Sequence, residues 1–559
     1  MENVDTTAAC LGELPDGQHE VPRSHEARFW RTPGFWILLI LGLASVCYRS
    51  WELTVETGPV YCNSDEGHHT IDAVQYVLAQ DPFADSYNPS TLFPVFSAIK
   101  VVGFWLFGAN EFGLRFPSVL AMTGMSVLLA WLAWRHGSWF AGLLTFGLMQ
   151  SSFLYHVYAR VGTHESILLL TTSLAIAVML WALRTQRTAL FVLAGVLVAL
   201  PPFVKTTGIS VGPVALGLAF LAWWKWRDWW NRRLGLAVLS AGLTMALIVG
   251  GWMLPHWTDM LICLRGAYHP GMSIGESIRT FCIGFWQISP VWTLAIPVAL
   301  VGLIYRWRAT TRVDQALLVA MVLWLVGSSA ILLYSSYKPA RFYLWCLTPL
   351  AVLIALGVES LVRRLPRAQW RPTALAVVLV LMLGATLYRQ VPLFQASLTT
   401  VRYAFLETTA ALTPYVAGET LRGSGVARYS LAWSDVLIDL DIAAEPTCDE
   451  LAALSLADRP HLISAFIGDV PARIVAAGVE DRFIATANSL ASPCEDFSAD
   501  YRPYLLVPQN PFGNTWNVWL IRKDLPGIPT APMHEQLRRA AEQDWAPFVP
   551  RDEQVLTIP

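Results

Sequence analysis

The segment from Asp65 to Asp72 concentrates side chains that can move protons or bind metal. It holds three carboxylates and two imidazoles within eight residues. A serine and the acidic pair Asp65-Glu66 stand where a helix would begin. On that helix Asp65, either His68 or His69, and Asp72 share one face. This arrangement suits a general base or a divalent metal, while the plain alternative is a solvated helix start whose acids favour the helix dipole.

Four cations further along the chain are candidates to bind an anionic group: Arg160, Lys205, Lys338 and Arg341. Lys205 follows an apolar stretch, and a charge near membrane depth is costly enough to indicate a functional site. The alternative is a lysine that extends to the lipid headgroups. Arg160 could equally form a structural ion pair with Glu165 or Asp65.

The amino-acid composition indicates the environment in which these residues lie. Of the 559 residues, 55% are hydrophobic and only 14% are charged, and the mean hydropathy is +0.45. These values exclude a disordered chain and an ordinary soluble globule, and indicate that lipid surrounds most of the chain. The net charge of −2 gives no basic signal for nucleic acid. The sequence also lacks a P-loop and a Gly-rich dinucleotide fingerprint.

Long apolar runs predict a mostly helical, polytopic membrane domain over residues 32–389, preceded by a cytoplasmic tail of residues 1–31. Each bilayer crossing needs about 20 apolar residues, and we expect about 11 such helices. The predicted spans are 32–48, 113–133, 139–156, 166–183, 189–204, 207–222, 234–254, 286–305, 314–333, 341–357 and 373–388.

Basic residues predict the orientation of these spans, because they accumulate in cytoplasmic loops. Every second loop carries them, from Arg31 before the first span to Arg371 before the last. The sequence therefore predicts a protein of the inner (plasma) membrane with a cytoplasmic N-terminus and an extracytoplasmic C-terminal domain.

Two long segments fall on the predicted outer face. Residues 50–112 contain the Asp65–Asp72 cluster and an apolar piece, 92–107, that predicts a helix lying on the membrane surface. Residues 390–559 mix short strand-like and helical pieces, and predict a small α/β domain. Cys448 and Cys494 lie in that domain and could pair in an oxidising compartment.

Several motifs, in order, resemble the GT-C fold membrane glycosyltransferases that use polyprenyl-phosphate sugars, among them the aminoarabinose transferases and protein O-mannosyltransferases. The first is Asp65-Glu66, followed by Phe107-Gly-x-x-Glu111-Phe-x-x-Arg115-x-Pro117. The remaining matches are Arg160-Val-Gly-Thr-His-Glu165, Phe203-Val-Lys205-Thr and Lys338-Pro-Ala-Arg341-Phe-Tyr343. They cover about residues 55–350, and the tail matches no family that we name.

The resemblance implies an inverting transfer of a sugar to a hydroxyl of a lipid, glycan or protein at the outer membrane face. It implies that Asp65 is the base, that Glu66 orients it or binds the acceptor, and that Glu165 takes the second acidic place. The departing lipid phosphate would meet Lys205, Lys338 and Arg341, with Arg160 and Tyr343 as further candidates. His68 and His69 are candidate ligands for a divalent cation, because some GT-C enzymes require one.

The sequence departs from the family pattern in ways that leave the sugar open. Leu92-Phe-Pro94 lacks the Lys that usually precedes this Pro in the aminoarabinose type, Glu165 replaces Asp, and Thr206 replaces Gly. The alternative function is a transporter or flippase of a lipid-linked glycan, which would place polar residues in broken helices at mid-membrane, often in repeated halves. A third hypothesis is a non-catalytic sensor whose tail domain binds a ligand.

Overall fold

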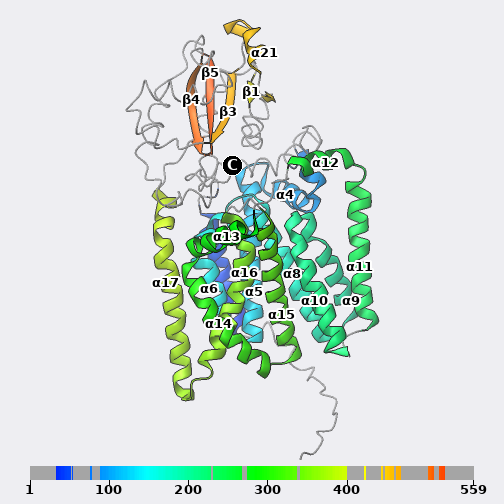
Figure 1. Ribbon diagram of the computed structural model, residues 1–559, viewed down its shortest axis with the longest axis vertical. Helices are drawn as coiled ribbons and strands as arrows, with labels where there is room; N and C mark the ends of the chain where they lie inside the picture. The colour runs from blue at the N-terminus through cyan, green and yellow to red at the C-terminus, as the bar shows by residue number, and fades with distance from the viewer. Residues whose placement is uncertain are drawn as a thin grey trace, which may run out of the picture.

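The computed structural model describes most of the membrane domain and parts of the tail. Described are residues 33–51, 53, 73, 76–77, 89–227, 231–266, 273–335 and 340–399, and the tail pieces 421–423, 442–444, 447–458, 461–467, 501–508 and 515–522. A bundle of long helices forms the body, and a small sheet lies beyond one end of it (Figure 1).

The helices of the bundle follow the apolar runs of the sequence. Within the described part of the chain, nine helical segments are long and apolar enough to cross a membrane. The main helices are α1(Pro33–Ser50), α5(Glu111–His136), α8(His164–Thr185), α10(Val211–Trp224), α11(Arg232–Ile248), α14(Pro290–Ala309), α15(Arg312–Tyr334), α16(Leu344–Val362) and α17(Arg371–Thr399).

Two predicted spans coincide with shorter helices. The span 139–156 is split at Ser152 into α6(Trp139–Ser151) and α7(Phe153–Ala159). The span 189–204 is divided into α9(Thr188–Ala199) and the 3-10 turn η3(Pro201–Phe203), because paired prolines end α9. All eleven predicted spans therefore coincide with helices of the structure. The number of helices that cross the bilayer stays a prediction. The chain is an integral, multi-pass membrane protein with a mostly helical architecture.

Helix α16 forms the centre of the bundle, and every residue from Leu344 to Glu359 is buried. It packs against α14, α15 and α6. Small residues allow the closest of these contacts: a Cβ atom built on Gly302 of α14 would overlap the backbone of Gly357. Such close approach of small residues is a common way to pack helices in lipid, where apolar burial drives association weakly.

The apolar piece after the Asp65–Asp72 cluster is helical as predicted. It forms α4(Pro94–Phe107), which packs against the start of α5. Its one charged residue, Lys100, is fully buried and donates to the Leu114 carbonyl at 2.7 Å and to Ser118 at 3.0 Å. Arg115 of the 107–118 motif is also buried and donates to the Leu53 carbonyl at 3.0 Å. This part of the family motif therefore joins the surface helix to the bundle.

Two further helices occupy the predicted outer loop after α11. The chain passes from α11 through the π-helical turn η6(Val249–Met253) to α12(Trp257–Gly266), and then resumes with α13(Ile274–Ile288). Together with α4 they lie at the end of the bundle that faces the sheet (Figure 1).

The described tail contains a five-stranded mixed sheet in the order β2-β1-β3-β5-β4. Strand β1(Leu421–Gly423) runs parallel to β2(Ile442–Ala444) and β3(His461–Ile467), whereas β5(Thr515–Arg522) is antiparallel to β3 and to β4(Tyr501–Pro508). The short helix α21(Cys448–Ala452) accompanies the sheet. Cys448 is disulfide-bonded, while its predicted partner Cys494 lies outside the described residues.

Candidate functional site

Glu165 lies in the first turn of α8, and only 1% of its side chain is exposed. The positive end of the helix dipole favours a carboxylate at this position. The preceding helix α7 ends at Ala159, and residues 160–163 turn the chain into α8. The turn is fastened by Ser166, whose hydroxyl donates to the Tyr158 carbonyl at 2.6 Å.

Lys205 and Arg341 meet at the Glu165 carboxylate, and we call these three residues the Glu165 cluster. The Lys205 ammonium donates to Oε1 of Glu165 at 2.6 Å, and Nε of Arg341 lies 3.6 Å from the same oxygen. The two cationic side chains are 13% and 12% exposed. Three segments distant in the sequence thus bring charged groups to one point.

A tight loop holds Lys205 in place. It lies between η3 and the 3-10 helix η4(Thr206–Ser210), with extended backbone. Its amide donates to the Pro201 carbonyl at 3.2 Å, and its carbonyl accepts from Gly208 at 2.8 Å. A Cβ atom at Gly208 would lie 2.2 Å from the Pro201 backbone, so the turn requires glycine there.

Aromatic rings from the start of α16 cover the cations. The Lys205 ammonium lies 4.6 Å from the ring centroid of Phe342 and 5.2 Å from that of Trp345, and Arg341 lies over Phe342 at 5.5 Å. The two rings stack with centroids 4.4 Å apart. Cation–π contacts of this kind strengthen where water is excluded.

Two further residues of the 160–165 motif, Arg160 and His164, lie at the junction of α7 and α8. Arg160 is buried at the end of α7. His164 is buried against the rings of Phe93 and Phe96, at centroid distances of 4.8 and 3.9 Å. This position explains the histidine beside the acidic residue as part of the packing between α4 and α8.

Tyr343 is fully buried and faces α13. Its ring stacks on Phe281 at 5.8 Å, and its hydroxyl donates to the Thr280 carbonyl at 3.4 Å. The neighbouring Gly284 accommodates that hydroxyl, because a Cβ atom there would overlap it. These contacts give Tyr343 a packing role, and its predicted contact with phosphate has no support in this geometry.

Five predicted site residues lie outside the described residues: Asp65, Glu66, His68, His69 and Lys338. Among the residues that the structure describes, no group of three or more His, Cys, Asp or Glu side chains could hold a metal ion. The base and the divalent cation therefore stay predictions.

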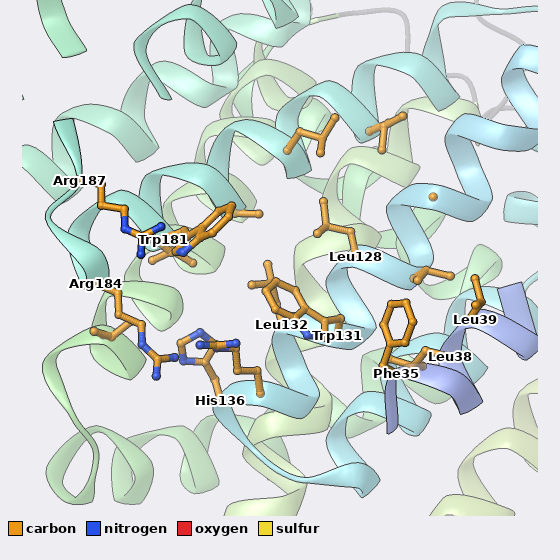
Figure 2. Close-up of a pocket in the computed structure, with 18 residues that line it drawn as sticks. Phe35, Leu38, Leu39, Leu128, Trp131, Leu132, His136, Trp181, Arg184 and Arg187 are labelled. Atoms are coloured by element: carbon orange, nitrogen blue, oxygen red, sulfur yellow. The ribbon is translucent and has the colours of Figure 1, made fainter. Parts of the chain in front are cut away.

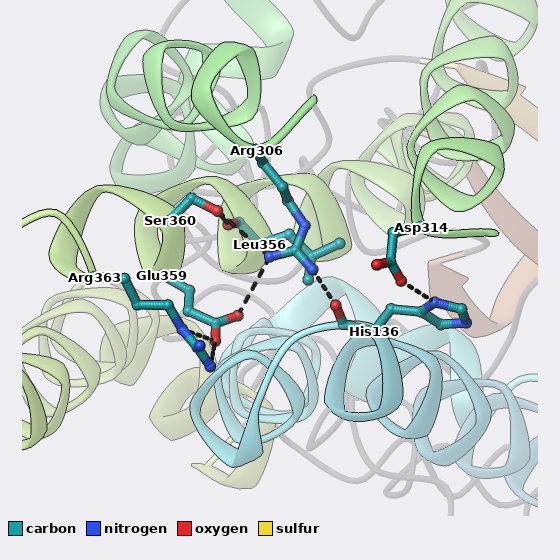
Figure 3. A network of polar contacts seen from close by, with 7 residues as sticks. All are labelled: His136, Arg306, Asp314, Leu356, Glu359, Ser360 and Arg363. Atoms are coloured by element: carbon teal, nitrogen blue, oxygen red, sulfur yellow. Dashed lines mark hydrogen bonds and ion pairs between the residues drawn. The ribbon is translucent and has the colours of Figure 1, made fainter. Parts of the chain in front are cut away.

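A second buried carboxylate was missed by the sequence reasoning. Glu359, near the end of α16, is fully buried and contacts Arg363 at 2.6 Å and Arg306 at 3.9 Å (Figure 3). Arg306 also donates to the His136 carbonyl, and the His136 ring meets Asp314 at 2.7 Å. We call this group the Glu359 cluster. The spacing of Glu359 and Arg363 by four residues on a helix was the available sequence signal.

Comparisons with known proteins agree with this architecture. Residues 88–252 match the family described as dolichyl-phosphate-mannose-protein mannosyltransferase, a range that includes Arg160, Glu165 and Lys205. An undecaprenyl phosphate-alpha-4-amino-4-deoxy-L-arabinose arabinosyl transferase of Pseudomonas fluorescens is 28% identical over 312 residues. That alignment covers 51% of this chain and about half, 50%, of the relative.

Two solved structures share the fold. The crystal structure of apo ArnT from Cupriavidus metallidurans has a TM-score of 0.57 at 15% identity, covering 88% of this chain and 99% of that one. The oligosaccharyltransferase of Archaeoglobus fulgidus, tethered to an acceptor peptide, has a TM-score of 0.50 at 12% identity, covering 90% of this chain and 75% of that one. The resemblance found in the motifs is confirmed: this is a polytopic membrane protein with the GT-C fold of the polyprenyl-phosphate-sugar glycosyltransferases.

Proposed function

We propose that this protein is an inverting glycosyltransferase that moves a sugar from a polyprenyl-phosphate donor to a hydroxyl acceptor. The Glu165 cluster is the observation that supports the proposal. In it, Lys205 and Arg341 come from separate loops and lie against the same carboxylate. The departing group in such a reaction is a lipid phosphate, and preorganised cations stabilise the charge that develops on it. The relatives that match the chain are named for transfers from undecaprenyl or dolichyl phosphate sugars.

In the proposed reaction, the acceptor hydroxyl attacks C1 of the sugar while Asp65 takes its proton. The bond from C1 to the phosphate oxygen breaks, and the lipid phosphate departs toward Lys205 and Arg341. Glu165 is already held by both cations, so we assign it the positioning of those cations rather than proton transfer. Glu66 would orient Asp65 or bind the acceptor.

We further propose that the Glu165 cluster and the tail domain lie on the extracytoplasmic side. Helix α17 leads from the opposite end of the bundle to the sheet (Figure 1). Because α16 comes before α17 in the chain, the start of α16, which Arg341 precedes, lies toward the sheet end. The basic loops favour this orientation, and the disulfide at Cys448 is typical of an oxidising compartment. The names of the relatives favour a pentose or hexose as the sugar, with a lipid or peptide acceptor.

The test is a transfer assay with purified protein in nanodiscs. Undecaprenyl-phosphate aminoarabinose and polyprenyl-phosphate mannose serve as donors, with a lipid A precursor and a Ser/Thr peptide as acceptors. We expect transfer by the parent chain and a loss of roughly 100- to 1,000-fold in kcat/KM for Lys205→Met, because one charge that stabilises the leaving phosphate is removed. Asp65→Asn should be inactive.

Lys225→Met is the matched control, because this lysine also lies over an aromatic ring, Trp307 at 4.8 Å, and contacts an uncharged partner, Gln315 at 3.2 Å. It should transfer as the parent does. Unchanged transfer by Asp65→Asn would exclude the proposed base. Movement of the lipid-linked sugars across vesicles without any transfer would instead support a flippase.

A further inference from the structure

A deep groove opens between α1, α5 and α8, away from the Glu165 cluster (Figure 2). Its volume is about 960 Å³, at the upper end of the range for ligand-binding cavities. Most of its wall is apolar, and a single residue of α15, Val313, contributes to it. Side chains of α1, α5 and α8 form this apolar wall, among them Phe35, Leu128, Trp131, Leu170 and Trp181.

One side of this groove carries three arginines and a histidine. Arg135 and His136 come from the last turn of α5, Arg184 from the last turn of α8, and Arg187 from the residue that precedes α9. Figure 2 shows Arg184, Arg187 and His136 together on one side, and Phe35, Leu38 and Leu39 on the other. None of the residues that line the groove is acidic. The lining thus combines a long apolar surface with a cationic margin.

The cationic margin lies at the other end of α8 from the Glu165 cluster. Glu165 is in the first turn of this helix and Arg184 in its last. At 1.5 Å per residue the two positions are about 28 Å apart along the helix axis, which is close to the thickness of the hydrocarbon core. The cationic margin of the groove therefore lies at the membrane leaflet opposite the proposed reaction. The basic loops predict that this is the cytoplasmic leaflet.

We propose that this groove binds an anionic phospholipid of that leaflet, with its phosphate at Arg135, Arg184 and Arg187 and one acyl chain along α1 and α5. Arginine pairs with phosphate through two parallel hydrogen bonds, so three arginines and no acidic residue in the lining of one groove favour an anionic headgroup over a zwitterionic one. Trp131 and Trp181 line the same groove, and tryptophan is enriched at headgroup depth. The bound lipid would join α1 to the bundle.

The groove adjoins the Glu359 cluster, which makes this binding relevant to stability. His136 belongs to both: its ring is held by Asp314 and its carbonyl accepts from Arg306. Lipid binding at the margin of the groove should therefore stabilise the end of α5 together with the helices that meet there. Ligands that bind only the folded state raise its stability by mass action.

Native mass spectrometry of the full chain in detergent tests the proposal. The chain is titrated with phosphatidylglycerol or phosphatidylcholine of identical acyl chains. We expect one phosphatidylglycerol to bind in preference, and its affinity to fall roughly 30-fold in the double variant Arg184→Gln/Arg187→Gln, because each basic residue contributes about five-fold. Arg232→Gln/Arg233→Gln on α11 is the matched control and should bind as the parent does.

A second pair of variants tests the apolar part of the groove. Gly124→Phe should abolish the preferred adduct by filling the groove, and Gly124→Ala should retain it, because a Cβ atom there makes ordinary contact with Leu170 at 3.6 Å. Equal binding of the two phospholipids, an equal loss in the α11 control, or preferred binding of polyprenyl phosphate would overturn the proposal. The readout is binding alone, so its failure is independent of the transfer assay.

Discussion

The two ends of α16 carry similar charges with different surroundings. At one end Glu165 is held by Lys205 and Arg341, and at the other Glu359 is held by Arg306 and Arg363. Both carboxylates are buried almost completely. In the first cluster the two cations come from short loops around 3-10 turns, whereas in the second all the charged side chains project from long helices.

The comparison distinguishes the Glu165 cluster, the proposed phosphate-binding site, from the Glu359 cluster, whose contacts are structural. Loops on a rigid scaffold are the usual place for binding and catalytic residues, and the cations of the Glu165 cluster lie on loops beside aromatic rings. The Glu359 cluster instead joins the ends of α5, α14 and α16 through helix-borne side chains and a backbone carbonyl (Figure 3). The first three predictions test the structural role of the Glu359 cluster, and the last experiment compares it with the Glu165 cluster.

The largest expected effect on stability is at Glu359. Glu359→Gln removes the carboxylate that forms an ion pair with Arg306, which is 8% exposed, and leaves Asp314 as the other acidic side chain of the cluster that acts on it. Breaking a buried pair in this way costs about 3–5 kcal/mol of unfolding free energy. SDS titration in mixed micelles measures it. The double variant Arg306→Met/Glu359→Met removes both charges and should recover most of the stability; if it does not, the cluster acts by another route.

A smaller loss is expected at Gly137, which follows α5. A Cβ atom there would lie 2.4 Å from Oε2 of Glu359 and 2.9 Å from Leu356, so α5 and α16 could no longer approach as closely. Gly137→Ala should cost about 1–3 kcal/mol, as overpacking of a well-filled interior does. The same titration checks it, with Gly124→Ala as the tolerated control. Equal stability of the two variants would contradict the close contact at Glu359.

The smallest effect is expected at Arg363, whose side chain is 54% exposed although it makes the shorter of the two arginine contacts to the Glu359 carboxylate. An exposed pair of this kind, spaced four residues apart on a helix, contributes about 0–1 kcal/mol. Arg363→Gln should therefore melt within a few degrees of the parent in a thermal unfolding experiment. A loss as large as that of Glu359→Gln would mean that Arg363, rather than Arg306, is the principal partner.

The sequence predicted the helical spans well, because a bilayer imposes length and apolarity on each helix. It also selected Glu165, Lys205 and Arg341 one by one. Their meeting was not predicted, since Arg160 was the partner considered for Glu165. Glu165 and Lys205 meet because α8 and α9 pack against each other, and the partners of a charge depend on that packing rather than on local pattern.

Lys100 and Glu359 show the limit of hydropathy reasoning. Lys100 stands in an otherwise apolar helix, and its hydrogen bonds to the Leu114 carbonyl and to Ser118 reach the neighbouring helix. Glu359 lies just beyond the predicted end of its span, where a charge is expected to face the headgroups. Both make contacts with a neighbouring helix, which a single sequence does not reveal.

The most direct test of the two roles is to make the same substitution at both carboxylates. Glu165→Gln and Glu359→Gln are compared for kcat/KM per folded molecule in the transfer assay, at a temperature at which both are folded. If Glu165 positions the cations for the leaving phosphate, its variant should lose roughly 100-fold or more, and the Glu359 variant should stay within a few-fold of the parent. Equal losses at both positions, or full activity of Glu165→Gln, would contradict the account.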